Sequence, residues 1–360
     1  MEVFELFHPW RVMTIVLDMR TDYIFLEEMR QVGDTEADTL ITRLFDQQLG
    51  RFVYSMLKLN RDEIAGGAAH PTIRDFLITP ARKPDWFEEE RLLGGQRFFR
   101  KHALDIMTLL GALSLPYCYA ASPGNKAIYF TEKMRNTPGK RLLETAQFII
   151  SVLDVGSFQT DAGAFETQRT RLIHALVRYH ILKEKQWDLQ WGLPVNQEDM
   201  AGTNLAFSFV ILRGLEESNV RMSDREKEDF LHAWRFIGYQ LHIEEALLPA
   251  SIEEASQLEQ SIRNRHFRTS EESRMLTRDL IRHYRESFPA IAGYFVESQI
   301  RYLTGPDVAD LLGIPRKPVR DELVRGINAI RRKINQFGHN PLSYQIMLRN
   351  HLQLKKKYSV

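Results

Sequence analysis

One stretch of the sequence places an arginine, a histidine and a second arginine on the same side of an expected helix. Arg171, His174 and Arg178 stand at i, i+3 and i+7, a spacing that brings their side chains to one helix face. An imidazole can coordinate a metal ion, and guanidinium groups bind anions through charged hydrogen bonds. Together these residues could hold an anionic group that contains a metal.

The residues around this motif predict a buried helix, so the two arginines need a partner. No acidic residue occurs between Thr167 and Lys183, within helical reach of either arginine. A buried charge is costly unless it is paired. We therefore expect something anionic from elsewhere to meet them. The surrounding apolar residues are Leu172, Ile173, Ala175, Leu176, Val177, Ile181 and Leu182.

Two interpretations of this anion remain open. Haem b offers an iron that accepts an imidazole and two propionates that accept hydrogen bonds from arginine, so one cofactor would satisfy Arg171, His174 and Arg178. Alternatively, the arginines pair with carboxylates of other helices, and His174 is a hydrogen-bonded core histidine. The spacing alone favours the second interpretation.

A second segment, after the Pro138-Gly139 break, combines a polar stripe with apolar packing positions. Arg141, Glu144, Thr145 and Phe148 fall at i, i+3, i+4 and i+7. If the stripe lines a pocket, Arg141 and Thr145 would donate hydrogen bonds to an oxygen species at the iron, and Glu144 would take a proton from the substrate. The alternative is an ordinary Arg–Glu pair on the surface.

These two segments resemble a known family, the haem-b oxygenases that include the bacterial rubber oxygenase (latex clearing protein) and the fungal mpaB enzyme. The family carries Arg-x-x-x-Thr on one helix and Arg-x-x-His-x-x-x-Arg further on, and Arg141, Thr145, Arg171, His174 and Arg178 match both motifs with the same separation. The resemblance implies that His174 is the proximal haem ligand. It also implies that Arg141 and Thr145 are pocket residues and that Arg171 and Arg178 hold the cofactor.

The resemblance covers most of the chain, from about Tyr23 to Pro315. It implies an all-α fold, with one large helical domain over residues 1–360, a globin-like core at about 23–315 and additional C-terminal helices at 316–360. The further matching pieces are Gly33-Asp34-x-x-Ala37-Asp38, Leu113-Ser114-Leu115-Pro116, Gly192-x-Pro194-x-Asn196-Gln197-Glu198-Asp199 and Trp234-Arg235-x-x-Gly238.

The sequence departs from the family at two places that matter for proton transfer. The rubber oxygenase has a lysine directly before the distal threonine, where this chain has Glu144. It also has an upstream glutamate that acts as a base, whereas the corresponding stretch here, residues 123–127, contains no acid. Glu144 is therefore our candidate for the base or for a group that holds water.

The function implied by the resemblance is an oxygenase that uses O2 and haem b at a carbon–carbon double bond. Its substrate would be apolar, an isoprenoid or an unsaturated lipid, held against Ile106, Leu109, Leu110 and Leu113. A non-catalytic haem protein that senses or carries haem or a gas is an alternative. A third possibility is a helical protein without haem whose arginines pair internally.

Helical periodicity interrupted by start and stop signals independently predicts an all-α fold. Asp34 and the Pro84-Asp85-Trp86 segment are expected to open two core helices, and Pro194-Val195-Asn196 a third. Ser223-x-x-Glu226 and Thr269-x-x-Glu272 have the pattern of capping boxes. The apolar stretch 106–121, which contains Pro116, predicts a buried wall and not a transmembrane segment.

Composition excludes several classes of partner and site. The 48 basic and 47 acidic residues give a net charge of +1, which does not favour nucleic-acid binding. The single cysteine, Cys118, excludes internal disulfides and multi-cysteine metal sites and fits a reducing compartment. The first twenty residues lack the basic start of a secretory signal, so we expect a cytoplasmic protein.

Other metal sites have less support. His232 and His242 share a helix face with Arg235 and Tyr239 and are rival ligands. Asp229-x-x-His232 with two later glutamates lacks the paired Glu-x-x-His signature of carboxylate-bridged di-metal bundles. Phosphate-binding loops, zinc-protease helices and serine nucleophile turns are missing from the sequence.

Overall fold

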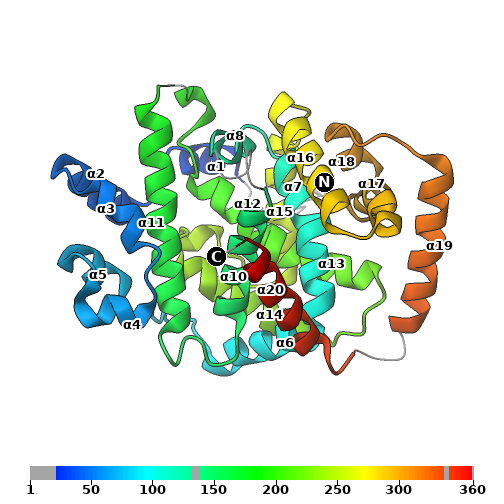
Figure 1. Cartoon of the computed structure of the whole chain (residues 1–360), viewed down its shortest axis with the longest axis horizontal. Helices are drawn as coiled ribbons and strands as arrows, with labels where there is room; N and C mark the ends of the chain where they lie inside the picture. The colour runs from blue at the N-terminus through cyan, green and yellow to red at the C-terminus, as the bar shows by residue number, and fades with distance from the viewer. Residues whose placement is uncertain (1–21, 132–137, 186, 336–339, 359–360) are drawn as a thin grey trace, which may run out of the picture.

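The computed structural model describes residues 22–131, 138–185, 187–335 and 340–358. Throughout these ranges the regular structure is helical, and the only extended pairing is an isolated antiparallel bridge between Ala121 and Phe267. The all-α prediction is confirmed (Figure 1). The expectation about a secretory signal concerns residues outside the described ranges.

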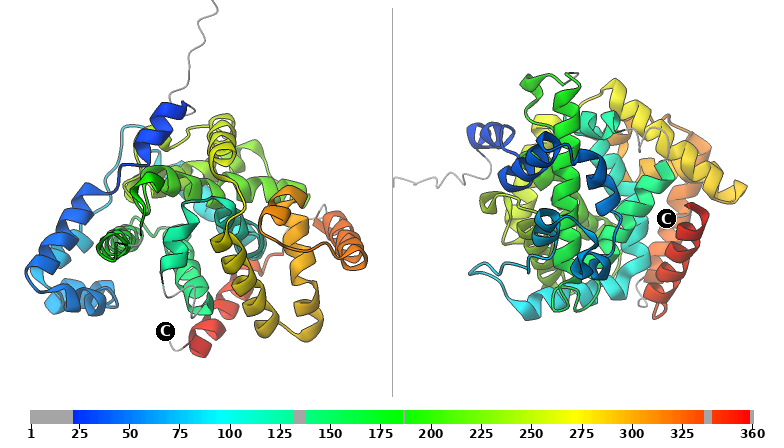
Figure 2. Two further views of the ribbon diagram at one scale, coloured as in Figure 1. Left: turned by 90° about the horizontal axis from the view of Figure 1, so that it is seen from above. Right: turned by 60° about the vertical axis from the view of Figure 1, so that its left-hand side comes forward.

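An N-terminal group of short helices packs on one side of the long helix α11, Ala162–Lys183. Figures 1 and 2 show this group on the outer side of α11, with the rest of the protein on its other side. Its apolar residues form a separate small core with Leu172, Ala175 and Leu176. The group comprises α2 (Thr35–Asp46), α3 (Gly50–Met56), α4 (Arg61–Glu63), the π-helical η2 (Ile64–Ala68) and α5 (Pro71–Leu77). The preceding helix α1 (Tyr23–Met29) lies on the other side of α11, and its Leu26 belongs to the main core.

The main core is built around α6 (Glu89–Leu109) and α14 (Asp224–Gln240), which pack closely against each other. A Cβ atom on Gly95 of α6 would lie 2.4 Å from the backbone oxygen of Asp229, so only glycine allows this approach. The other helices here are η3 (Leu110–Ser114), α7 (Leu115–Ala120), α8 (Asn125–Phe130), α10 (Pro138–Leu153), η4 (Leu189–Trp191), α12 (Gln197–Phe207), α13 (Phe209–Glu217), η5 (Glu245–Leu247) and α15 (Ile252–His266).

Five C-terminal helices complete the fold, of which α16 to α19 lie on the side away from the N-terminal group and α20 returns to the middle of the molecule (Figure 1). α20 packs on α6 and α10, whereas α19 packs mainly on α17 at the edge of the molecule. The helices are α16 (Glu271–Ser287), α17 (Ala290–Thr304), α18 (Pro306–Leu311), α19 (Pro318–Asn335) and α20 (Ser343–Tyr358).

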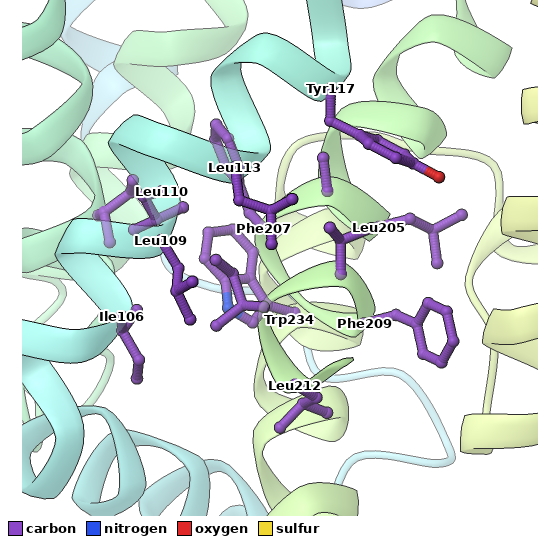
Figure 3. Packing of buried hydrophobic residues seen from close by; sticks show 14 of the residues in the cluster. Ile106, Leu109, Leu110, Leu113, Tyr117, Leu205, Phe207, Phe209, Leu212 and Trp234 are labelled. Atoms are coloured by element: carbon purple, nitrogen blue, oxygen red, sulfur yellow. The ribbon is translucent and has the colours of Figure 1, made fainter. Parts of the chain in front are cut away.

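The apolar stretch after α6 is a buried wall, as expected, but it faces the core. Ile106, Leu109, Leu110 and Leu113 are all at most 5% exposed, and Figure 3 shows the side chains of Leu109 and Leu113 pointing toward Phe207 and Trp234. The expectation that they contact substrate is therefore wrong. An apolar run predicts burial without saying what covers it.

The helical run of the same stretch continues through Pro116. The π-helical turn η3 leads directly into α7, where Pro116 occupies the first turn and needs no backbone donor. The resulting helical run Glu89–Ala120 has the length and composition to cross a membrane. Because 56% of its apolar window is buried inside the protein, it also fits a core helix.

Three of the five predicted helix starts are confirmed and two are wrong. Asp34, Asn196 and Ser223 cap α2, α12 and α14 through their side chains. α6 begins at Glu89, and Trp86 lies before it with its indole N–H donating to Glu245 at 2.9 Å. α16 is capped one residue later than expected, through a box of Ser270 and Ser273, since the Thr269 hydroxyl donates to the backbone oxygen of Leu311 at 3.3 Å.

The close approach of α6 and α14 gives a stability prediction. Gly95→Ala should lower the free energy of unfolding by about 1–3 kcal/mol, because the methyl group overpacks the contact with Asp229 and Ala233. Gly326→Ala in α19 is the matched control: no atom lies within 4 Å of its Cβ position, so the substitution should stabilise by about 0.5–1 kcal/mol. Urea denaturation of both variants measures this, and equal effects would contradict the packing argument.

Candidate functional site

A cavity of about 310 Å³ lies between α7, α8, α10, α11, α12 and α15. Its size is that of a small-molecule site, and its walls are mainly apolar. The polar side chains that line it come from a few places on these helices. The wall residues include Leu115, Ile128, Leu142, Phe148, Ile173, Val177, Met200, Leu205, Phe207, Ile262 and Phe267.

His174 enters this cavity from α11. Thr170, Ile173, His174 and Val177 all line it, at the i, i+3, i+4, i+7 spacing of one helix face. The Nδ1 atom of His174 is buried and has no hydrogen-bond partner among the described residues. His174 is therefore not the hydrogen-bonded core histidine of the second interpretation.

The environment keeps the His174 imidazole neutral. Burial, the charge of Arg178 and the charge of Arg141 lower its pKa to about 3. A neutral imidazole has a nitrogen lone pair free to coordinate a metal ion. The influence of Arg141 also shows that the two segments singled out in the sequence lie near each other.

The polar stripe of α10 lines the same cavity. Arg141, Glu144, Thr145 and Phe148 all contribute to its wall, while Leu143, Ile149, Ile150 and Leu153 are buried in the packing surface of the helix. The Thr145 hydroxyl donates to the backbone oxygen of Arg141 at 3.1 Å. The structure thus brings His174, Arg141, Glu144 and Thr145 together, and their chemical roles stay predictions.

Arg171 and Arg178, by contrast, do not line the cavity. Arg171 donates to both carboxylate oxygens of Asp34, at 2.7 and 2.9 Å, and to Glu36 at 2.8 Å. Arg178 donates to Asp38 at 2.7 Å and to the backbone oxygen of Val195 at 2.9 Å. The anions expected to meet the arginines are carboxylates at the start of α2, so these contacts are not available to a cofactor.

The buried Asp34–Arg171 pair shifts the acidity of the carboxyl group. Burial favours the neutral acid, but the hydrogen bonds and charge of Arg171 outweigh it and lower the pKa of Asp34 below 3.8. At Asp38, burial outweighs the attraction of Arg178 and raises the pKa. The Asp34 carboxylate therefore stays ionised at neutral pH and neutralises Arg171.

Sequence reasoning missed a second polar group in the cavity wall. Glu259 and Arg263 on α15, together with Tyr117 on α7, line it. The Tyr117 hydroxyl donates to Glu259, and Arg213 lies 3.8 Å from the same carboxylate. Burial raises the pKa of Glu259, and the buried Nε of Arg263, which has no hydrogen-bond partner, lies 3.8 Å from the Glu259 carboxylate. Glu259 and Arg263 stand at i and i+4, but nothing in the sequence points them toward the cavity.

A buried ion network fixes the wall beside this group. Glu198 is fully buried and accepts from Arg265 at 2.8 Å, while Arg30 lies 3.2 Å from its other oxygen. His266, which lines the cavity, lies 2.8 Å from that same oxygen. Burial alone would raise the pKa of Glu198, but His266 and Arg265 lower it. The Gln197-Glu198-Asp199 turn thus joins α1, α12 and α15.

The rival metal ligands lie elsewhere. His232 accepts a hydrogen bond from the backbone N–H of Glu88 at 3.3 Å and packs edge-on against Trp86. His242 is exposed, and neither histidine lines the cavity. Within the described ranges, no group of three His, Cys, Asp or Glu residues is arranged to hold a metal ion.

The Asp34–Arg171 pair gives a stability prediction. Asp34→Asn should destabilise the protein by about 3–5 kcal/mol at pH 7, because it leaves a buried arginine without its carboxylate. Since the pKa of Asp34 is lowered, this contribution is present above pH 3.8 and is lost as the pH falls through the lowered pKa. The difference in the free energy of unfolding between Asp34→Asn and the parent protein should therefore become smaller at low pH.

Urea denaturation at several pH values measures this difference. Asp75→Asn is the matched control, since the Asp75 side chain is 65% exposed beside Arg74 and should cost less than about 1 kcal/mol. A similar loss in both variants would contradict the role given to Asp34.

Comparison with known proteins identifies the family. A family model described as the catalytic domain of "ER-bound oxygenase mpaB/B'/Rubber oxygenase" matches residues 99–334. A rubber oxygenase from Streptomyces sp. (strain K30) is 22% identical over 299 residues, which cover 81% of this chain and 73% of that protein. The structure of latex clearing protein LCP in the closed state matches with a TM-score of 0.74 at 21% identity, over 91% of this chain and 90% of that one.

The fold similarity agrees with the all-helical architecture, and the family match spans more than half of the chain. The resemblance noted in the sequence is thereby confirmed. The chain is a member of the mpaB and rubber oxygenase catalytic-domain family and, as such, an oxygenase.

Proposed function

We propose that the chain is a haem-b-dependent oxygenase that acts with O2 on a carbon–carbon double bond of an apolar substrate. The observation that carries the proposal is the environment of His174. Its imidazole is neutral, its Nδ1 has no hydrogen-bond partner, and it lines an apolar cavity together with Arg141, Glu144 and Thr145. The substrate class, an isoprenoid or an unsaturated lipid, follows from the apolar walls and from the family.

The residues of the cavity fit haem b. A single imidazole is sufficient as a protein ligand, because the porphyrin supplies the other donors around the iron. With Arg171 and Arg178 paired to α2, the cations that line the cavity are Arg141 and Arg263, and these would pair with the propionates. When bound, the haem would supply the iron that reacts with O2.

The chain's own residues would orient the substrate and control protons. Arg141 and Thr145 supply hydrogen-bond donors within the cavity, where low polarity strengthens them. Glu144 would accept a proton from the substrate or hold a water molecule. Glu259 is a second cavity carboxylate, and its raised pKa lets it hold a proton nearer to neutral pH.

Cytoplasmic localisation belongs to the same proposal. The net charge of +1 offers no general attraction to nucleic acid. Burial raises the pKa of the Cys118 thiol to about 12, so the free cysteine is kept in its unreactive form. Fractionation of the native cell would test this part of the proposal.

His174→Ala should abolish stoichiometric haem binding, because it removes the ligand that the structure presents to the cavity. Absorbance titration with haemin measures this as loss of the Soret band of the bound cofactor. His232→Ala is the matched control and should bind haem normally, since His232 lies outside the cavity. An unchanged spectrum in His174→Ala would refute the ligand assignment.

The catalytic part of the proposal is tested separately on the haem-loaded protein. Oxygen consumption should appear with polyprenyl alkenes or unsaturated fatty acids and be absent with their saturated analogues. Normal haem binding without oxygen consumption on either class would instead support a haem or gas carrier.

Glu144→Gln should lower turnover by about 100-fold while leaving haem binding intact, because it removes a proton acceptor and keeps the shape of the side chain. Glu259→Gln removes another carboxylate of the cavity wall and should retain most of the turnover. The opposite pattern in steady-state oxygen consumption would assign proton transfer to Glu259.

A further inference from the structure

Helix α19 carries a continuous apolar stripe on its exposed side. Its members recur at i, i+4, i+8, i+11 and i+15, which places them along one helix face. The opposite face packs inward through Val324 and Asn328, where Asn328 donates to Gln299 of α17 at 3.0 Å. The stripe consists of Val319 (76% exposed), Leu323 (52%), Ile327 (55%), Ile330 (63%) and Ile334 (62%).

The apolar surface continues onto the start of α17. Ile291 is 80% exposed and Tyr294 is 49% exposed. Arg320 of α19 stacks on the Tyr294 ring at 3.4 Å and donates to its backbone oxygen at 3.3 Å, so the two patches adjoin. Figures 1 and 2 place α19 at the outer edge of the molecule. Contiguous exposed apolar surface of this kind marks a site of association.

The charges beside the stripe indicate what associates there. Basic residues exceed acidic ones on α19 by five to two, and the last turns are basic. Among the basic side chains, Arg331 pairs with Asp105 and Arg325 with Glu322, whereas Arg332 and Lys333 are exposed in the last turns of the helix. A second copy of the chain would bring two such basic surfaces together, which is unfavourable. Anionic lipid headgroups would neutralise them.

We propose that α19 and the first turn of α17 form a membrane-binding surface for anionic lipid. The 18-residue helix would lie parallel to the bilayer with its apolar stripe in the boundary between headgroups and acyl chains. Its basic side chains would contact the phosphates. This surface is distinct from the cavity residues, and the proposal does not depend on haem binding or on the reaction.

Cosedimentation of the full chain with vesicles tests the proposal. We expect binding to vesicles of phosphatidylcholine and phosphatidylserine, and weaker binding to phosphatidylcholine alone. The double variant Leu323→Glu, Ile330→Glu should lose at least about tenfold in partition coefficient, because each change removes buried methylene groups from the lipid contact. Arg332→Gln with Lys333→Gln should weaken binding to the anionic vesicles only.

The matched control is Ile24→Glu with Leu189→Glu. Both residues are exposed apolar side chains, at 67% and 62%, on elements outside the stripe, so this variant should bind like the parent. Unchanged circular dichroism and thermal midpoint establish that each variant folds.

Four results would overturn the proposal. One is parent protein that does not sediment with anionic vesicles. The second is equal binding by the stripe variant and the parent. The third is a parent dimer in light scattering that becomes monomeric in the stripe variant, since a second copy would then cover the stripe. The fourth is binding to vesicles that appears only after removal of residues 1–21, since that segment would then cover the stripe in the full chain.

Discussion

The site depends on how α11 is rotated about its own axis, and two buried ion pairs fix that rotation. Arg171 and Arg178 must face the carboxylates of Asp34 and Asp38, because an unpaired buried guanidinium would cost several kcal/mol. Successive residues of an α-helix are rotated by about 100° around its axis, so the His174 side chain projects at an angle to those of the two arginines. It therefore points away from α2 and toward the cavity. The ion pairs do not contact the cavity, yet they aim the imidazole into it.

Much of the architecture could be predicted because it rests on local patterns. Periodicity and capping residues predict helices such as α2, α12 and α14. The polar stripe on α10 predicts that one face of this helix lines a pocket or the surface and is not packed in the core. What could not be predicted is which distant residue each side chain meets. Asp34 pairs with Arg171 across 137 positions, and periodicity carries no information on such partners. For the same reason, the residues from Ile106 to Leu113 could not be assigned to core or substrate.

The cavity wall is also the place where stability and chemistry meet. His266 lines the cavity while it contacts Glu198, which in turn binds Arg30 and Arg265. Glu259 is held by Tyr117 on the same side. These groups lie on helices that are distant in sequence, so the polar character of this wall depends on the fold being complete. Among the charged residues of this wall, only the segment that contains Glu198 was singled out from the sequence, and it was singled out because it resembles the family.

The π-helical turn η3 determines which side chains the following helix offers to the cavity. Its extra residue lets one continuous helical run bury Leu109 and Leu113 in the core and then turn Tyr117 and Cys118 toward the cavity. Loss of one residue between positions 110 and 114 would restore an α-helix and rotate the side chains of α7 by about 100° around the helix axis. Insertions and deletions in this turn are thus a route by which relatives could exchange the cavity's lining without altering its other helices.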